Sequence, residues 1–184
     1  MTVDLNMLTP DFKTKVLQLL AQCKNKEGIE MHPNEGVRDP FKQAIYWRQS
    51  RSGSEIQAKI NELKAQGAPF LAHCIESVGP QNGPHVTNSI PGLSWHQFGE
   101  ALDCFWVVND KAEWSTTKLI NGKNGFRVYA KLASITGLDA GGLWTSLKDW
   151  PHVQLSKAAN PLKKFTLQQI DAKMRERFGV NILL

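Results

Sequence analysis

The sequence has 184 residues, which is enough to bury a hydrophobic core and is the size of one ordinary domain. Apolar residues make up 41% and charged residues 21% of the chain, values that exclude wholesale disorder and fibrous repeats. The net charge is +5, but the basic residues are scattered, so we expect no nucleic-acid binding. No stretch is apolar enough to cross a bilayer, and we expect no stable membrane association.

The N-terminal residues and the cysteines indicate where the protein is made. The N-terminus lacks the basic region and apolar run of a signal peptide, which predicts synthesis in a cytoplasm without an export signal. Cys23, Cys74 and Cys104 lie far apart and form no Cys-x-x-Cys pair. This spacing argues against a disulfide framework and a cysteine-based zinc cluster, so each cysteine is expected to be a buried, small apolar residue.

The first third of the chain predicts two helices. Residues 9–11, Thr-Pro-Asp, predict a helix start, and apolar residues spaced by three and four continue the pattern to Gly28. Residues 29–39 are expected to be irregular, and residues 41–46 fit either a short strand or a helix. Residues 54–57 match a capping box at the start of a second helix that stops at Gly67.

The remaining elements alternate between loop, strand and helix. Glycines and prolines predict a long ordered loop over residues 78–93, and a saturated apolar run predicts a strand buried on both faces over residues 101–108. Residues 126–136 have helical spacing, and Gly141 and Gly142 mark the connection that follows. A short strand is expected at 152–155 and a last helix at about 166–178, so the chain is expected to be α+β.

Two separated stretches carry the residue types of a catalytic metal site. His96 and Asp103 lie in the first stretch, and His152 lies in the second, three residues after Asp149. Two imidazoles and one carboxylate supply three ligands, the number that leaves a fourth tetrahedral position open on zinc. Asp149 then remains off the metal, where it accepts a proton from water and passes it to the leaving amine.

Either motif by itself is usually an accident of sequence, and a structural zinc site is a further alternative. Structural sites generally close the shell with four thiolate or imidazole ligands, and the two motifs themselves contain no cysteine. An open catalytic site therefore explains the two motifs better.

The separation of His96 and Asp103 requires a break in the strand. They are seven residues apart, an odd number, so on one unbroken strand their side chains would point to opposite faces. Gly99 lies between them and can adopt backbone angles that other residues avoid. We expect a turn or bulge at Gly99, with the small Ala101 leaving room beside Asp103.

At these residues the sequence resembles the zinc-dependent D,D-carboxypeptidase and L-alanyl-D-glutamate peptidase family, which includes phage endolysins and vancomycin-resistance peptidases. Two family motifs, Ser-x-His-x-x-Gly-x-Ala-x-Asp and an acid three residues before a histidine, are matched by Ser94, His96, Gly99, Ala101, Asp103, Asp149 and His152. The resemblance implies a Hedgehog/D,D-peptidase-like fold, in which a small antiparallel sheet carries the zinc site and packs with several helices. It implies one peptidase domain over 1–184 with a motif-bearing core at about 36–156.

The resemblance also implies a role for each site residue. It implies that His96, Asp103 and His152 bind one zinc ion, that Asp149 is the catalytic acid/base, and that Ser94 and Trp150 lie around the ligands or the substrate. Residues 51–57 resemble the family's Arg-Ser-x-x-Glu-Gln pattern with one residue inserted, which assigns substrate binding to Arg51. Arg48 is the competing arginine, and a surface position is the alternative for both.

The implied function is hydrolysis of an amide bond in the stem peptide of bacterial peptidoglycan. An aspartate at position 149, where other branches have glutamate, resembles the endolysin branch. We therefore expect a monomeric L-alanyl-D-glutamate endopeptidase of a phage or prophage, made in the host cytoplasm and acting on the cell wall after release. The alternatives are a D-Ala-D-Ala carboxypeptidase or dipeptidase, and a non-catalytic, zinc-containing wall-binding module.

Overall fold

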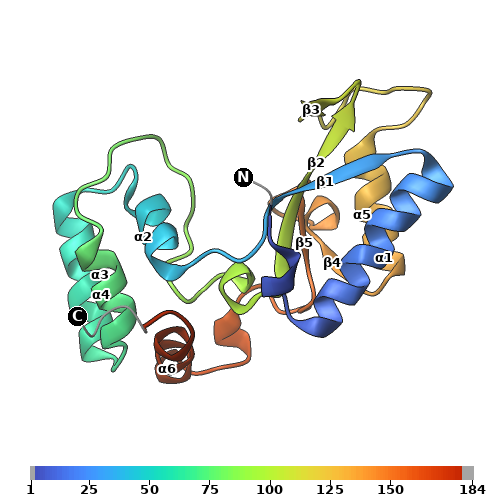
Figure 1. Cartoon of the computed structure of the whole chain (residues 1–184). Coiled ribbons are helices and arrows are strands. Elements are labelled where there is room, and N and C mark those ends of the chain that lie inside the picture. The colour runs from blue at the N-terminus through green and yellow to red at the C-terminus, as the bar shows by residue number, and fades with distance from the viewer. Residues whose placement is uncertain (1–2, 180–184) are drawn as a thin grey trace. The chain divides into compact units, whose positions relative to one another are not determined.

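The computed structural model describes residues 3–179, which divide into two compact units (Figure 1). The first unit contains residues 3–37 and 98–157, and the second contains residues 38–97 and 158–179. Helices and a small antiparallel sheet make up the structure, which confirms the α+β class. A single domain over 1–184 stays a prediction.

The first unit contains the sheet. Its strands are β1 (Glu30–Glu35), β2 (Ala101–Val108), β3 (Lys111–Glu113), β4 (Asp139–Ala140) and β5 (His152–Gln154). The strand order is β1-β2-β5-β4, β3 also pairs with β2, and all the pairings are antiparallel. The two sequence stretches that carry the motifs therefore reach neighbouring strands, β2 and β5.

Strand β1 corrects the expectation that residues 29–39 are irregular. Glu30 pairs with Val107, and the pairing continues until the register shifts between Pro33 and Glu35. Proline lacks the backbone N–H that a central strand would use, and Pro33 is tolerated because β1 ends the strand order. The sequence pattern missed the strand because its partner lies about seventy residues further along the chain.

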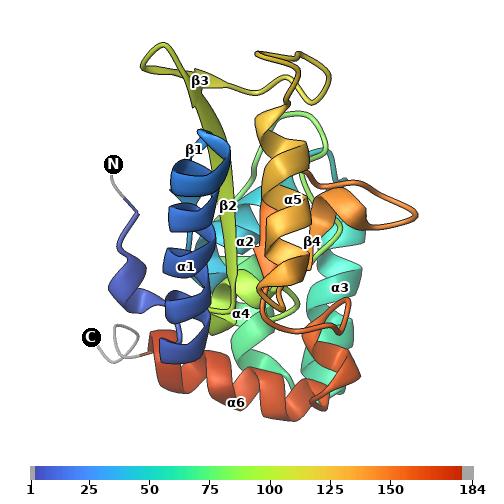
Figure 2. The same ribbon diagram turned by 90° about the vertical axis from the view of Figure 1, so that its right-hand side faces the viewer.

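Two helices cover one face of this sheet. They are α1 (Pro10–Glu27) and α5 (Gly125–Ile135), and they lie side by side in Figure 2. Their apolar faces form one core with the inward side chains of β2, namely Leu102, Cys104 and Trp106. Both helices confirm the predicted ones, although the side chain of Thr9 makes no capping hydrogen bond to α1.

The other face of β2 is less buried than the sequence predicts. Ala101 and Leu102 are both buried, but from Asp103 onward buried and half-buried residues alternate. Asp103 and Phe105 are half-buried on the face opposite the helices. The prediction of burial on both faces is therefore right only at the start of the strand, and Asp103 keeps access to solvent.

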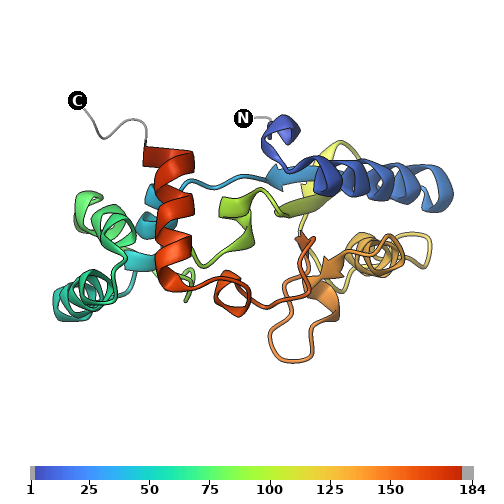
Figure 3. The same ribbon diagram turned by 90° about the horizontal axis from the view of Figure 1, so that it is seen from below.

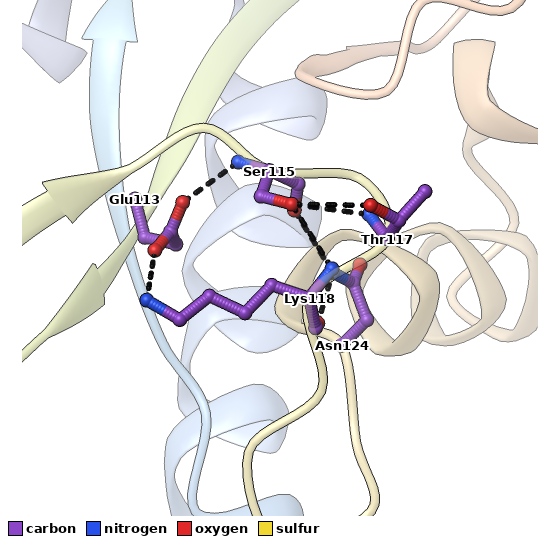
Figure 4. A network of polar contacts seen from close by, with 5 residues as sticks. All are labelled: Glu113, Ser115, Thr117, Lys118 and Asn124. Carbon is purple, nitrogen blue, oxygen red and sulfur yellow. Dashed lines mark hydrogen bonds and ion pairs between the residues drawn. The ribbon is translucent and has the colours of Figure 1, made fainter.

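The segment between β3 and α5 is held by a network of polar contacts (Figure 4). Glu113 accepts hydrogen bonds from the Ser115 backbone N–H at 2.9 Å and from Lys118 Nζ at 2.6 Å. Asn124 Nδ2 donates to the carbonyl oxygens of Ser115 and Lys118, while its Oδ1 accepts from the Arg127 N–H. Asn124 thus caps α5 and also orders the segment that leads into it.

The second unit is helical. Its main helices are α2 (Pro40–Arg48), α3 (Gly53–Ala65), α4 (Pro69–Ser77) and α6 (Leu167–Phe178). Helix α4 packs against α2, α3 and α6, as Figure 3 shows. The buried carboxylate of Asp171 on α6 accepts the backbone N–H of Leu71 at 2.9 Å and so supplies the missing cap of α4.

Local signals in this unit are mostly confirmed. Residues 41–46 form part of helix α2, which decides between the two expected structures. The capping box of α3 consists of Ser52 and Glu55, two residues before the predicted one. The capping box of α6 consists of Thr166 and Gln169, as predicted.

Within residues 3–179, three short 3-10 helices complete the connections outside the site, at Leu5–Met7, Gly141–Leu143 and Pro161–Lys163. Among residues 3–179, none of the helices has the length and apolarity needed to cross a bilayer.

The three cysteines behave as the sequence predicts. Cys23, Cys74 and Cys104 are buried and form no disulfide with one another. Burial raises the pKa of the Cys23 thiol to about 12 and raises the pKa of the other two thiols as well. The thiols are therefore protonated at neutral pH and unsuited to metal binding or nucleophilic chemistry.

Candidate metal centre

The three predicted ligands lie together. His96 belongs to a 3-10 helix (Trp95–Phe98), Asp103 lies on β2, and His152 is the first residue of β5. Each side chain offers one ligand atom, and these atoms all lie within 4.8 Å of one another. Two imidazoles and a carboxylate are a donor set suited to zinc, so the residues present fit the ion.

The sheet register brings Asp103 and His152 together. They are direct partners in the antiparallel pairing of β2 with β5, so their side chains leave the same face of the sheet. His152 Nδ1 lies 3.0 Å from Asp103 Oδ1. They lie forty-nine positions apart in the sequence, and one strand pairing brings them together.

Gly99 has the backbone geometry that the motif spacing predicts. Its φ is 72°, in the left-handed region that favours glycine, and its carbonyl oxygen accepts the Thr9 N–H at 3.0 Å. His96 lies before this turn and β2 begins after it, at Ala101. The predicted break between His96 and Asp103 is therefore confirmed, because the two residues do not lie on one continuous strand.

Local contacts fix the 3-10 helix that carries His96. The Gln97 backbone N–H donates to the Ser94 carbonyl oxygen at 3.1 Å, and the Gln97 side-chain carbonyl accepts the Gly92 N–H at 2.6 Å. Trp95 is buried, and its Nε1 donates to the Ala158 carbonyl oxygen at 2.7 Å. Ser94 is thus shown only as a backbone contact, and a role for its side chain toward ligand or substrate stays a prediction.

His152 is buried among polar groups. It is 7% exposed, its Nε2 lies 3.0 Å from Gln154 Oε1, and its ring packs at 5.3 Å from the ring of Trp144. Burial alone lowers the pKa of His152, but the hydrogen bond to Asp103 and the charges of Asp103 and Asp149 outweigh it. The pKa is therefore raised above 6.5, and a metal ion must compete with a proton for this side chain.

Asp149 lies at the edge of this group. It is exposed to solvent, and its carboxylate is close enough for its charge to favour the protonated form of His152. Its backbone N–H donates to the Gly141 carbonyl oxygen at 3.1 Å, and its own carbonyl oxygen accepts the His152 N–H at 3.2 Å. The backbone of Asp149 is thus fixed on both sides, and the residue is exposed.

The neighbouring Trp150 packs into the protein. It is half-buried against the core of the first unit, and the side chains of Arg127 and Lys148 lie over its ring at 5.9 Å and 5.7 Å. These contacts describe a packing residue, so a role of Trp150 in substrate binding stays a prediction.

The two candidate arginines are engaged with backbone carbonyls of the second unit. Arg51 stacks over the Trp47 ring at 4.4 Å and donates to the carbonyl oxygens of Trp47 and Thr87, the latter at 3.1 Å. Arg48 Nη1 donates to the Ile75 carbonyl oxygen at 2.7 Å, near the end of α4. Arg51 therefore ties α2 to the loop before the first motif, and its role toward substrate stays a prediction.

Sequence reasoning did not single out Gln154. This residue is 2% exposed and bonds to His152, Asp139 and the backbone of Ser156. A polar residue at the end of a short strand, two positions after a predicted ligand, is the available signal. From the sequence alone, a glutamine at this position cannot be told from a glutamine exposed to solvent.

Comparison with known proteins gives one family match and similarities to solved structures. Residues 87–155 match the model of a family described as D-alanyl-D-alanine carboxypeptidase. The chain is similar to the Serratia marcescens L-Ala D-Glu endopeptidase ChiX, with 18% identity, a TM-score of 0.43, and 83% of each chain covered. It is also similar to a mutant of the vancomycin resistance D,D-pentapeptidase VanY in complex with Zn(II), with 16% identity and a TM-score of 0.45, covering 81% of this chain and 73% of that chain. No curated protein matches by sequence.

The matched segment contains the complete motif set. Residues 87–155 include His96, Asp103, Asp149 and His152, and the three predicted ligands among them lie close enough to share one ion. Both the family match and this cluster are typical of an enzyme rather than of an unrelated α+β domain. The chain is a metallopeptidase whose residues 87–155 match the D-alanyl-D-alanine carboxypeptidase family model.

Proposed function

We propose that this protein is a zinc-dependent peptidoglycan peptidase that hydrolyses an amide bond of the stem peptide. The observation that carries the proposal is the close grouping of His96, Asp103 and His152, with the solvent-exposed Asp149 adjacent to it in the fold. The family description, D-alanyl-D-alanine carboxypeptidase, names the class of peptide that such a site acts on.

Each site residue has a distinct chemical task in this proposal. His96, Asp103 and His152 would hold one zinc ion, which when bound lowers the pKa of a water molecule to about 7. Asp149 accepts the proton of the attacking water and delivers it to the leaving amine. Its exposed position suits this task, because a proton carrier must reach both water and substrate.

The specific bond that we favour is the one between L-alanine and D-glutamate, as cut by phage or prophage endolysins. Support comes from Asp149, because an aspartate at this position resembles the endolysin branch of the family. The second candidate is removal of terminal D-alanine, which the description of the matching family favours. A non-catalytic wall-binding module is disfavoured because the acid Asp149 is present.

Digestion of purified muropeptides by the zinc-loaded protein, followed by mass spectrometry, distinguishes these candidates. We expect glycan fragments that retain only L-alanine, together with released peptides that begin with D-glutamate. Loss of terminal D-alanine alone would replace our specific bond with the second candidate. If neither product appears above the level of the His96→Ala protein, the chain is not a peptidoglycan peptidase.

A further inference from the structure

A chain of buried and half-buried polar contacts lies behind His152, on the side away from Asp103. Gln154 Oε1 lies 3.0 Å from His152 Nε2, and Gln154 Nε2 donates to the Ser156 carbonyl oxygen at 2.7 Å and to Asp139 Oδ2 at 3.3 Å. Asp139 Oδ2 also accepts the indole N–H of Trp144 at 2.9 Å. All of these residues belong to the first unit.

These contacts determine which end of the Gln154 amide faces His152. A backbone carbonyl and an ionised carboxylate only accept hydrogen bonds, so the amide NH₂ of Gln154 is directed to Ser156 and Asp139. The indole N–H of Trp144 holds the carboxylate of Asp139 in place. The oxygen of the amide is therefore the atom that faces the imidazole.

The orientation of the amide in turn determines where His152 carries its proton. An amide oxygen only accepts, so the 3.0 Å contact requires a proton on His152 Nε2. In a neutral imidazole the lone pair then belongs to Nδ1, the nitrogen that faces Asp103. The lone pair of His152 Nδ1 and the carboxylate oxygen of Asp103 are thus brought within 3.0 Å of each other.

We propose that Gln154 is a positioning residue that holds His152 in its Nε2–H form, so that Nδ1 is the nitrogen that binds the metal. Asp139, held by Trp144, keeps the Gln154 amide from turning over. The proposal rests on the proposed function only in that it takes zinc as the metal. It is tested without any peptidase assay, so its failure is distinguishable from failure of the proposed function.

The first test is spectroscopic and uses the unmodified sequence. In zinc-loaded protein labelled with ¹⁵N-histidine, we expect the His152 resonances to show zinc on Nδ1 and a proton on Nε2 that exchanges slowly with water. Slow exchange follows from the burial of His152 and Gln154. Zinc on Nε2, or a rapidly exchanging Nε2 proton, would overturn the proposal without any variant.

The second test removes the acceptor. Gln154→Leu keeps the size of the side chain but deprives Nε2–H of its partner, so we expect the zinc Kd to rise by about 10- to 100-fold. Gln154→Glu retains an acceptor, and we expect it to keep the Nε2–H signal and to bind zinc more tightly than the leucine variant. Affinity is measured by competition with a chromogenic chelator, and circular dichroism checks the fold.

A matched control separates positioning from general loss of a buried glutamine. Gln43 on α2 is fully buried, bonds to Arg38 and to the Ser89 carbonyl oxygen, and belongs to the second unit. Gln43→Leu should leave the His152 Nε2–H signal and the zinc Kd unchanged. If both leucine variants weaken zinc binding equally, or if neither does, Gln154 has no positioning role.

Discussion

Asp149 and His152 are three residues apart, yet their surroundings differ as their proposed tasks require. His152 is 7% exposed and both ring nitrogens have polar partners, so its ring has one orientation. Asp149 is exposed, and hydrogen bonds hold its backbone on both sides. A metal ligand benefits from a fixed position, whereas a proton carrier has to reach water and a leaving group.

Substitution of these residues should separate metal binding from catalysis. Asp149→Ala should bind zinc as before but lose about 10²- to 10⁴-fold in the rate of wall hydrolysis, because only the proton carrier is removed. His96→Ala should lose both zinc and activity, because one of three ligands is missing. Metal analysis of the purified proteins and a turbidity assay on cell walls measure the two properties.

The isosteric Asp149→Asn variant is the control for shape, and it should be as inactive as the alanine variant. Full activity of Asp149→Ala would show that another group carries the proton and that our assignment is wrong.

At the scale of elements, the approach of the 3-10 helix Gly141–Leu143 to the second motif explains the two adjacent glycines. A Cβ atom at Gly141 would lie 2.3 Å from the carbonyl oxygen of Asp149, and one at Gly142 would lie 2.5 Å from the Trp150 ring. Both contacts are shorter than carbon atoms tolerate. Because the two glycines have no side chain, the backbone of Asp149 can pack closely against this helix. That packing holds Asp149 beside His152.

Gly141→Ala should therefore destabilise the protein by about 1–3 kcal/mol, because the added methyl group forces the backbone at Asp149 to move. Urea unfolding followed by circular dichroism measures this change in the free energy of unfolding.

Gly53→Ala is the matched control, since no atom lies within 4 Å of its Cβ position and it begins helix α3 without a positive φ. It should be neutral or stabilise by up to about 1 kcal/mol. Equal effects of the two substitutions would contradict the packing argument.

At the scale of the whole molecule, metal binding and folding are expected to be linked. The three predicted ligands come from positions 96, 103 and 152, so the unfolded chain does not present them together. A ligand that binds only the folded state stabilises it by an amount that depends on its concentration relative to Kd. Zinc should therefore raise the melting temperature of the entire protein.

At a free zinc concentration about 100 times Kd the stabilisation is about 2.7 kcal/mol, which corresponds to a rise of about 5–10 °C for a chain of this length. Differential scanning calorimetry with and without a chelator measures the shift. The His96→Ala protein should show none of it. A melting temperature that zinc and chelator leave unchanged would contradict a site made of these three ligands.

Helices and caps can be predicted from the sequence where the contacts that stabilise them join residues close together in the chain. The capping box of Thr166 and Gln169 spans three residues, and both its position and its helix are as predicted. At α3 two serines fit the pattern, and the backbone geometry selects Ser52 over Ser54. Strand β1 was missed because its hydrogen bonds all go to β2, far along the chain.

The sequence by itself determined which atoms are available for chemistry: two imidazoles, a carboxylate and a nearby acid, with a glycine to break the strand between the first two. These are properties of side chains and of short spacings, which are already present in the unfolded chain. Only the tertiary structure decided that Asp103 and His152 are paired across two strands, and that Gln154 and Asp139 lie behind the imidazole. Those contacts join segments far apart in sequence, and they exist only once the sheet has formed.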